Sequence, residues 1–279
     1  EAGAANGRDS TEVARIQMSI AAVLRERGRY DEAEKLLNEA LPRLRRRLGE
    51  DHPDVAAGLA KLADLRHSRG DYAGAESLLR DALALMRKSS RAESWETASM
   101  LNRLGAVLRE ADSLDASAAA HIEALETLRR VLGETHPEVA TTLHDLAAVR
   151  LLQGDLSAAA SLHEQVVGIY RQRLAPDHHW LGTSLYDLAR VKIAQGDLTR
   201  AEQLMREALA IYKKALGPDH QFTAMALAGL GEARIKAQDP AGAEAFLKEA
   251  LTIYRRAFPR GNPVTGHVLV RLGEALIAG

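Results

Sequence analysis

A motif that returns every 42 residues constrains the fold of this chain more than any other feature. The first full copy runs from Gly28 to Arg69 and opens with Gly-Arg-Tyr-Asp-Glu-Ala-Glu. Its first residue recurs in register, with no insertion or deletion, at Gly70, Asp112, Gly154, Gly196 and Gln238. A fixed long period indicates a repeat array, so the two domains that 279 residues would suggest are not expected.

Columns of equivalent residues predict two amphipathic helices in each repeat. The helix at the end of each copy begins a helix pair, so we call it the first helix; it carries leucines three residues apart. Spacings of three and four mark one face of a helix. The first of these leucine columns contains Leu59, Leu101, Leu143, Leu185, Leu227 and Leu269. A column of small residues in the second helix contains Ala33, Ala75, Ser117, Ala159, Ala201 and Ala243. Small side chains at fixed positions predict close approach of the helix backbones.

Turn residues mark the ends of these helices. Gly-Asp pairs at 70–71, 154–155 and 196–197 supply a left-handed residue that ends one helix and a residue that caps the next. Asp51-His52-Pro53 begins the other helix, with proline at its first position. Each repeat therefore contains two turn signals, one before the start of each helix.

The motif Leu-Gly-x-x-His-Pro, followed by Leu-x-x-Leu-Ala, Gly-Asp-x-x-x-Ala-Glu and Ala-Leu, resembles a known repeat. It is similar to the tetratricopeptide repeat of the long, kinesin-light-chain-like kind, over about 250 residues. The ordinary repeat has a period of about 34 residues, and the extra length corresponds to about one more turn in each helix. HEAT and armadillo repeats lack the Gly-Asp…Ala-Glu turn, and a propeller needs more aromatic residues than this chain has. The Ala, Arg and Leu content resembles that of bacterial members, which are often fused to kinase, NTPase or protease domains.

These observations predict an all-α protein, a right-handed α-solenoid of antiparallel helix pairs with thirteen main helices and no strand. Residues 1–10 are expected to form a flexible lead-in, and residues 11–279 a single array. The expected helix pairs span about 12–48, 54–88, 95–132, 138–174, 180–216 and 222–257, with a last unpaired helix at 264–277.

Composition excludes several classes of function. The 37 Lys and Arg residues balance 38 Asp and Glu residues, which predicts no general attraction to nucleic acid or to an acidic membrane. The absence of cysteine excludes disulfides and thiolate metal sites. No apolar run is long enough to span a membrane and no signal peptide is visible, so we expect a cytoplasmic protein.

No motif predicts catalysis. The chain has no phosphate-binding loop, no Gly-x-Ser-x-Gly elbow and no dinucleotide fingerprint, so we expect no enzymatic activity, small-molecule substrate or cofactor. Four histidines share one column, His52, His136, His178 and His220. They lie at least one repeat apart and cannot converge on one metal ion, so we expect them to cap helices and pack in loops.

A column of cations ends the second helices, at Arg45, Arg87, Arg129, Arg171, Lys213 and Arg255. We call it the basic ridge. Its cations suit the negative ends of the helix dipoles. The alternative is a surface that binds an anionic partner such as nucleic acid, which the balanced net charge disfavours.

One stretch departs from the repeat. Ser90 to Trp95 replaces the Leu-Gly-x-x-His-Pro segment. Two interpretations remain open: sequence drift in one loop, or a kink or partner contact near Trp95.

The resemblance implies that the first helix of each pair lines a concave groove. We place the groove-facing residues one, five and eight positions after the first leucine, where side chains differ between repeats. The predicted peptide-binding residues are Asn102, Arg109, His144, Tyr186, Arg190 and Glu232. Kinesin light chains carry many asparagines in this groove and only Asn102 remains here, so their cargo peptides are not expected. The residues present suit an extended segment with an acidic group near an apolar side chain.

The sequence therefore predicts a scaffold for protein–protein interaction that binds a protein or an extended peptide. The alternative is the sensor or regulatory arm of a larger signalling enzyme. The last helix carries Leu269, Leu272 and Leu276 with nothing after it in the sequence to cover them, and open solenoid ends expose core. We therefore expect a longer parent protein, a fusion partner or self-association at this end.

Overall fold

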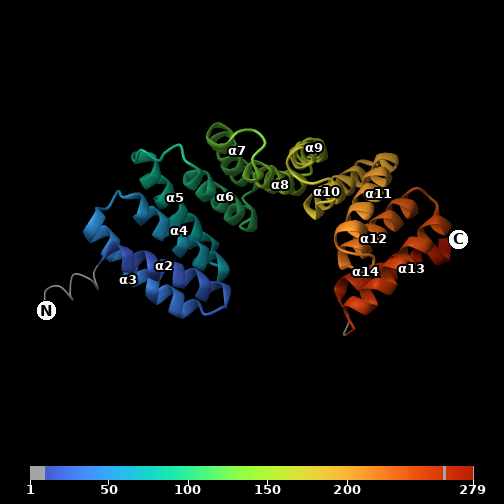
Figure 1. The fold of residues 1–279 in the computed structure, drawn as a ribbon, viewed down its shortest axis with the longest axis horizontal. Coiled ribbons are helices and arrows are strands. Elements are labelled where there is room, and N and C mark those ends of the chain that lie inside the picture. The colour runs from blue at the N-terminus through green and yellow to red at the C-terminus, as the bar shows by residue number, and fades with distance from the viewer. Residues whose placement is uncertain (1–9, 260–261, 279) are drawn as a thin grey trace. The chain divides into compact units, whose positions relative to one another are not determined.

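The computed structural model describes residues 10–259 and 262–278, and within these ranges it contains thirteen α-helices and no strand (Figure 1). The helices are α2 (Thr11–Glu26), α3 (Tyr30–Leu48), α4 (Pro53–Ser68), α5 (Tyr72–Lys88), α6 (Trp95–Glu110), α7 (Leu114–Leu132), α8 (Pro137–Leu152), α9 (Leu156–Arg173), α10 (His179–Gln195), α11 (Leu198–Ala215), α12 (Gln221–Lys236), α13 (Pro240–Ala257) and α14 (Pro263–Ala278). The predicted class, an all-α solenoid of antiparallel helix pairs, is confirmed. The expected lead-in lies outside the described residues, apart from Ser10.

Side-chain caps explain where the helices begin. Ser10 Oγ accepts a hydrogen bond from the Val13 backbone N–H at 3.2 Å, which fixes the start of α2. The four histidines of the shared column each cap a first helix through Nδ1. The backbone N–H groups that donate to them belong to Asp54, Glu138, Trp180 and Phe222, at 3.0, 3.2, 3.2 and 3.1 Å. The capping role predicted for this column is therefore confirmed.

The turn that follows each first helix needs a left-handed backbone. Gly70, Gly154 and Gly196 adopt φ angles of 78°, 78° and 81°, which cost glycine nothing. Asp112 and Gln238 occupy the same position without being glycine, at φ 59° and 58°. The two departures from the repeat motif therefore leave the turn intact but strained.

Replacing Gln238 with Gly is expected to raise the free energy of unfolding by about 1 kcal/mol, because it removes the steric cost of a left-handed β-carbon. Urea unfolding of the two proteins measures the difference. The matched control is Gly196→Ala, which should lower stability because it introduces that cost. Equal stability of Gln238→Gly and the parent would contradict the assignment of strain.

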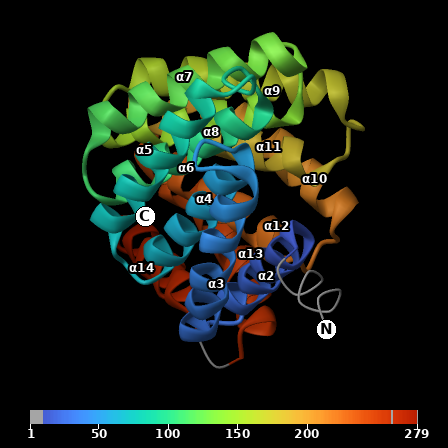
Figure 2. The same ribbon diagram turned by 90° about the vertical axis from the view of Figure 1, so that its left-hand side faces the viewer.

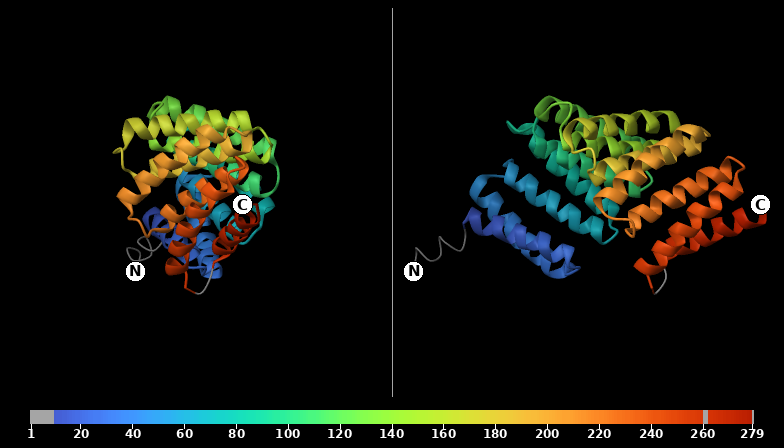
Figure 3. Two further views of the ribbon diagram at one scale, coloured as in Figure 1. Left: turned by 90° about the vertical axis from the view of Figure 1, so that its right-hand side faces the viewer. Right: turned by 45° about the vertical axis from the view of Figure 1, so that its right-hand side comes forward.

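The chain divides into two compact units, Glu1–Gln153 and Gly154–Gly279, here called unit 1 and unit 2. In unit 1 the antiparallel pairs are α2/α3, α4/α5 and α6/α7, several of which are labelled in Figure 2. In unit 2 they are α10/α11 and α12/α13, and α13 packs against α14 (Figure 3). The boundary falls in the turn between α8 and α9, at the start of the copy that begins at Gly154, and it divides the expected helix pair 138–174. A single array over residues 11–279 remains a prediction.

The core follows the columns read from the sequence. All six residues of the small column, Ala33 to Ala243, are fully buried. Glycines in the first helices have the same purpose, because a β-carbon on Gly231 would lie 2.6 Å from Leu247 Cγ. The leucine column is buried from Leu59 to Leu227, whereas Leu269 of α14 is 43 % exposed.

The C-terminal helix differs in part from the expectation. Leu269 and Leu276 are exposed, as predicted. Leu272 is instead buried, because it packs into the cluster formed with Leu247, Leu251 and Val268. Only part of the predicted open face of α14 is therefore uncovered.

Candidate functional site

The six predicted site residues are distributed over both units. Asn102, Arg109 and His144 belong to unit 1, on α6 and α8, whereas Tyr186, Arg190 and Glu232 belong to unit 2, on α10 and α12. The last three line one pocket of about 490 Å³. Unit 2 therefore contains the candidate site.

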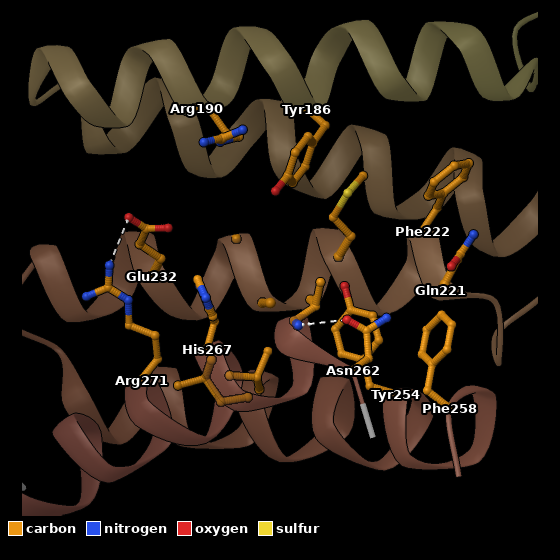
Figure 4. A pocket seen from close by; sticks show the side chains of 16 residues that line it. Tyr186, Arg190, Gln221, Phe222, Glu232, Tyr254, Phe258, Asn262, His267 and Arg271 are labelled. Atoms are coloured by element: carbon orange, nitrogen blue, oxygen red, sulfur yellow. Dashed lines mark hydrogen bonds and ion pairs between the residues drawn. The ribbon is translucent and has the colours of Figure 1, made fainter. Parts of the chain in front are cut away.

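The pocket lies among α10, α12, α13, α14 and the segment before α14, as Figure 4 shows. Residues three, four and seven apart share one side of a helix, so each first helix presents one short row of side chains to it. Tyr186 and Arg190 come from α10, and His267 and Arg271 from α14. The apolar lining includes Phe222, Met225, Leu247, Tyr254, Phe258 and Val268. A pocket of this size with an apolar lining and a few polar groups has the usual character of a ligand site.

One cation of the pocket has no ionic partner. Arg271 Nη2 lies 3.6 Å from Glu232 Oε1, and Arg271 Nη1 lies 3.0 Å from Glu274 Oε2, so this guanidinium is neutralised. Arg190 is exposed and makes no hydrogen bond or ion pair within the described part of the chain. The pocket lining therefore holds two arginines and one glutamate, and Arg190 can donate hydrogen bonds to a carboxylate of a ligand.

Tyr186 lies beside Arg190 and faces the pocket (Figure 4). Burial raises the pKa of its phenol, against the smaller opposing effect of the Arg190 charge. The hydroxyl stays protonated at neutral pH and has no hydrogen-bond partner among the described residues. The ring packs against the buried cluster that includes α10 and α11, although Tyr186 lies outside the leucine and small-residue columns.

Sequence reasoning missed more than half of the pocket lining. The expected column contains Tyr186, Ala228 and Val270, but Val270 is 63 % exposed and its neighbour Arg271 lines the pocket instead. The pocket-lining face of the first helices also includes the residue one position after this column and the residue three positions before it. The third expected column does not contribute here, since Ile193 is buried in the core. Testing neighbouring columns for variation between repeats would have found Arg271 and His267.

Asn102 of unit 1 is engaged in a buried network. Its amide donates to Thr142 Oγ1 at 2.7 Å, and its Oδ1 lies 3.0 Å from Nδ1 of the buried His121. These bonds connect α6 with α7 and α8. Arg109 is partly buried with Nη2 at 4.0 Å from Glu110 Oε1, and His144 is exposed. A peptide-binding role for these three residues remains a proposal.

The basic ridge is largely neutralised by neighbouring carboxylates. Five of its six cations form ion pairs, between Arg45 and Glu50, Arg87 and Glu123, Arg129 and Glu134, Arg171 and Glu207, and Lys213 and Glu249. Counterion-driven binding of nucleic acid needs a local excess of positive charge. The ion pairs reduce that excess and disfavour the ridge as an anionic-partner surface.

Within residues 10–259 and 262–278, no three His, Asp or Glu side chains are grouped so that they could hold a metal ion. Among the same residues, no helix combines the length and the apolar character needed to cross a membrane.

Comparison with known proteins places the fold. No curated protein sequence matches the chain. Several solved structures do, each below 25 % identity. Kinesin-light-chain repeats from Podosopora anserina match with TM-score 0.67 and 23 % identity, covering 74 % of this chain and 98 % of theirs. BtubC from P. vanneervenii matches with TM-score 0.67 and 21 % identity, covering 90 % and 94 %.

A third solved structure is similar over part of its length. The signal-transduction ATPase with a tetratricopeptide repeat sensor from Pyrococcus horikoshii matches with TM-score 0.75 and 16 % identity, covering 93 % of this chain and 38 % of its own. The tetratricopeptide repeat family itself matches residues 12–88, 96–172, 161–214 and 180–256, which together cover most of the chain. The protein therefore belongs to the tetratricopeptide repeat family, with repeats of the long kind found in kinesin light chains.

Proposed function

We propose that this protein binds an extended peptide segment of a partner protein in the pocket of unit 2. Tetratricopeptide repeats are generally scaffolds for protein–protein interaction. The observation that carries the proposal is the unpaired Arg190 beside the partly buried Tyr186, at the edge of an apolar pocket of about 490 Å³. A cytoplasmic location and a role as the sensor arm of a larger enzyme are compatible with this function and remain predictions.

The pocket chemistry defines the segment that it would hold. Phe222, Met225 and Phe258 offer an apolar surface for one large side chain of the ligand. Arg190 can bind a neighbouring Asp or Glu of the ligand through two parallel hydrogen bonds. The Gln221 amide can donate to and accept from a peptide backbone, and Asn262, whose Oδ1 accepts from the Val264 N–H at 2.8 Å, can donate through its Nδ2. The expected ligand thus has an acidic residue next to a large apolar one.

A synthetic peptide array followed by calorimetry tests this function. The best peptide from the array should bind Tyr186→Ala/Arg190→Ala more weakly by about 2 kcal/mol, or roughly thirtyfold in Kd. Because Tyr186 packs against the core, Arg190→Gln is measured as well, with an unfolding curve for each variant. Exchanging the acidic residue of the peptide for its amide should weaken binding to the parent but not to Arg190→Gln.

The control is Arg129→Ala/Arg171→Ala on the basic ridge, which should bind like the parent. If the Tyr186/Arg190 double variant captures the peptide as well as the parent does, while the ridge variant fails, the pocket is not the binding surface.

A further inference from the structure

Unit 1 contains a cleft that repeats the pocket of unit 2 four repeats earlier in the sequence. It has a volume of about 180 Å³ and lies between α4, the end of α5 and α6. Ten of its twelve lining residues have a counterpart in the lining of the unit 2 pocket, at the equivalent position of the 42-residue period. Among these pairs are Lys61 and Gly229, Met86 and Tyr254, and Arg103 and Arg271. The same kind of inter-repeat cleft therefore occurs in both units, with different side chains.

One cation in the lining of this cleft has no ion-pair partner in the part of the chain that the structure describes. Its lining holds three cations, Lys61, Arg91 and Arg103, and two carboxylates, Asp54 and Glu96. Arg91 Nη1 lies 3.2 Å from Glu96 Oε1. Within the described residues, Lys61 makes no hydrogen bond and no ion pair, although it is partly buried.

The other charges around this cleft are paired, which isolates Lys61 further. Arg103 Nη1 lies 2.9 Å from Asp64 Oδ2, and Arg15 Nη2 lies 2.6 Å from Asp54 Oδ2. Asp54 and Asp64 are therefore each paired with an arginine and make no ion pair with Lys61. An anion from outside is the natural partner for the remaining ammonium group.

The surroundings of Lys61 disfavour its charged form. Burial is the main cause that lowers the pKa of its amine, and the positive charges of Arg103 on α6 and Arg25 on α2 lower it further. Asp64, on the same helix as Lys61, acts in the opposite direction. A bound carboxylate would reverse these effects by adding an opposite charge.

The cleft also has an apolar wall. Trp95, at the first position of α6, lines it while 53 % exposed, and Met86, Met100 and Ala57 line it as well. An exposed indole and an unpaired ammonium in the lining of one cleft suit a ligand with one carboxylate and an adjacent aliphatic group. A polyanion is disfavoured, since Asp54 and Glu96 lie in the same lining.

We propose that unit 1 holds a second peptide-binding cleft, in which Lys61 binds an Asp or Glu side chain while Trp95 and Met100 contact its aliphatic neighbour. The inference rests on the contacts of unit 1 and stands whether or not the pocket of unit 2 binds a peptide. It also assigns Trp95 to a partner contact.

Tryptophan fluorescence tests the proposal in the full chain. Since the chain has two tryptophans, Trp180→Phe leaves Trp95 as the only reporter. The probe is acetyl-Leu-Asp-Leu-Glu-Leu-amide, and the comparison peptide carries Asn and Gln in place of Asp and Glu. The acidic probe should shift Trp95 emission to shorter wavelength, with a Kd about tenfold lower than that of the amide peptide.

Two substitutions of Lys61 separate its charge from its shape. Lys61→Met should raise the Kd of the acidic probe about tenfold, whereas Lys61→Arg should retain binding at neutral pH. Because the amine loses its proton as pH rises through its lowered pKa, binding should weaken toward alkaline pH in the Trp180→Phe protein. It should not weaken in Lys61→Arg, since arginine stays protonated. Circular dichroism and urea unfolding check that both variants fold.

The control for unit 2 is Arg190→Gln, which should leave the Trp95 signal unchanged. The proposal is overturned if the amide peptide binds as well as the acidic one, or if Lys61→Met binds like its parent. It is also overturned if inorganic phosphate or single-stranded DNA displaces the probe at similar concentration, because the cleft would then be a general anion site.

Discussion

Replacing Ala201 with Phe is expected to lower the free energy of unfolding by on the order of 1–3 kcal/mol. Ala201 is fully buried in α11, within the cluster that includes Leu204, Met205 and residues of α10. A phenyl ring at this position has no space and would force α11 away from α10. Protein interiors are packed to the density of organic crystals, so the displacement cannot be absorbed locally.

Urea unfolding followed by circular dichroism measures this loss. Ala210→Phe is the matched control, because it makes the same change on an exposed alanine of the same helix. The control should unfold within about 0.5 kcal/mol of the parent. If Ala201→Phe is also as stable as the parent, the small column does not mark close helix contact.

Acidification from pH 6.5 to pH 4 is expected to lower the free energy of unfolding by as much as about 3 kcal/mol through His121 alone. Its ring is fully buried against Gly105, and Nε2 has no hydrogen-bond partner. Burial, with a smaller contribution from the Arg109 charge, lowers the pKa of His121 from 6.5 to about 4.

The sign follows from the lowered pKa. The unfolded chain takes up a proton on this imidazole as pH falls below 6.5, while the folded protein does not until pH approaches 4. The stability that neutral His121 contributes is therefore complete above pH 6.5 and is lost as pH falls to the folded pKa.

His121→Leu should remove this component of the acid sensitivity. Leucine occupies the equivalent position at Leu247, against Gly231, so the substitution has a precedent within the chain. It also breaks the contact with Asn102, but that cost does not depend on pH. Urea midpoints measured from pH 7 to pH 4 compare the slopes, with His144→Leu on the exposed surface as control. Equal slopes for His121→Leu and the parent would refute the role of His121.

Local signals made the helices predictable. Helix starts depend on neighbouring residues, as with His52 and Pro53 at the start of α4, and the turns depend on one left-handed residue. The 42-residue period then places the core positions up to Leu227, because equivalent residues meet equivalent neighbours. Asp112 and Gln238 kept the turn geometry although their side chains broke the motif.

The candidate site was predictable only in part. Helical spacing grouped Tyr186, Arg190 and Glu232, and these three line one pocket because residues of one helical face point the same way. It could not select Tyr254 and Phe258, which enter the pocket from the end of α13. Their position in the pocket depends on how the second helix of one pair packs against the first helix of the next pair.

The sequence by itself determined the fold class, the period, the helix ends and the buried columns, since each depends on short-range spacing repeated many times. The tertiary structure alone decided which variable side chains share a cavity and which charges stay unpaired. Lys61 and Arg190 look like many other cations in the sequence, and most of those have a carboxylate within reach. Whether a charge finds a partner depends on distances between residues some 40 positions apart, such as the 2.9 Å between Arg103 Nη1 and Asp64 Oδ2. Such distances exist only after neighbouring repeats have packed, so the repeat pattern by itself does not predict the positions of these sites.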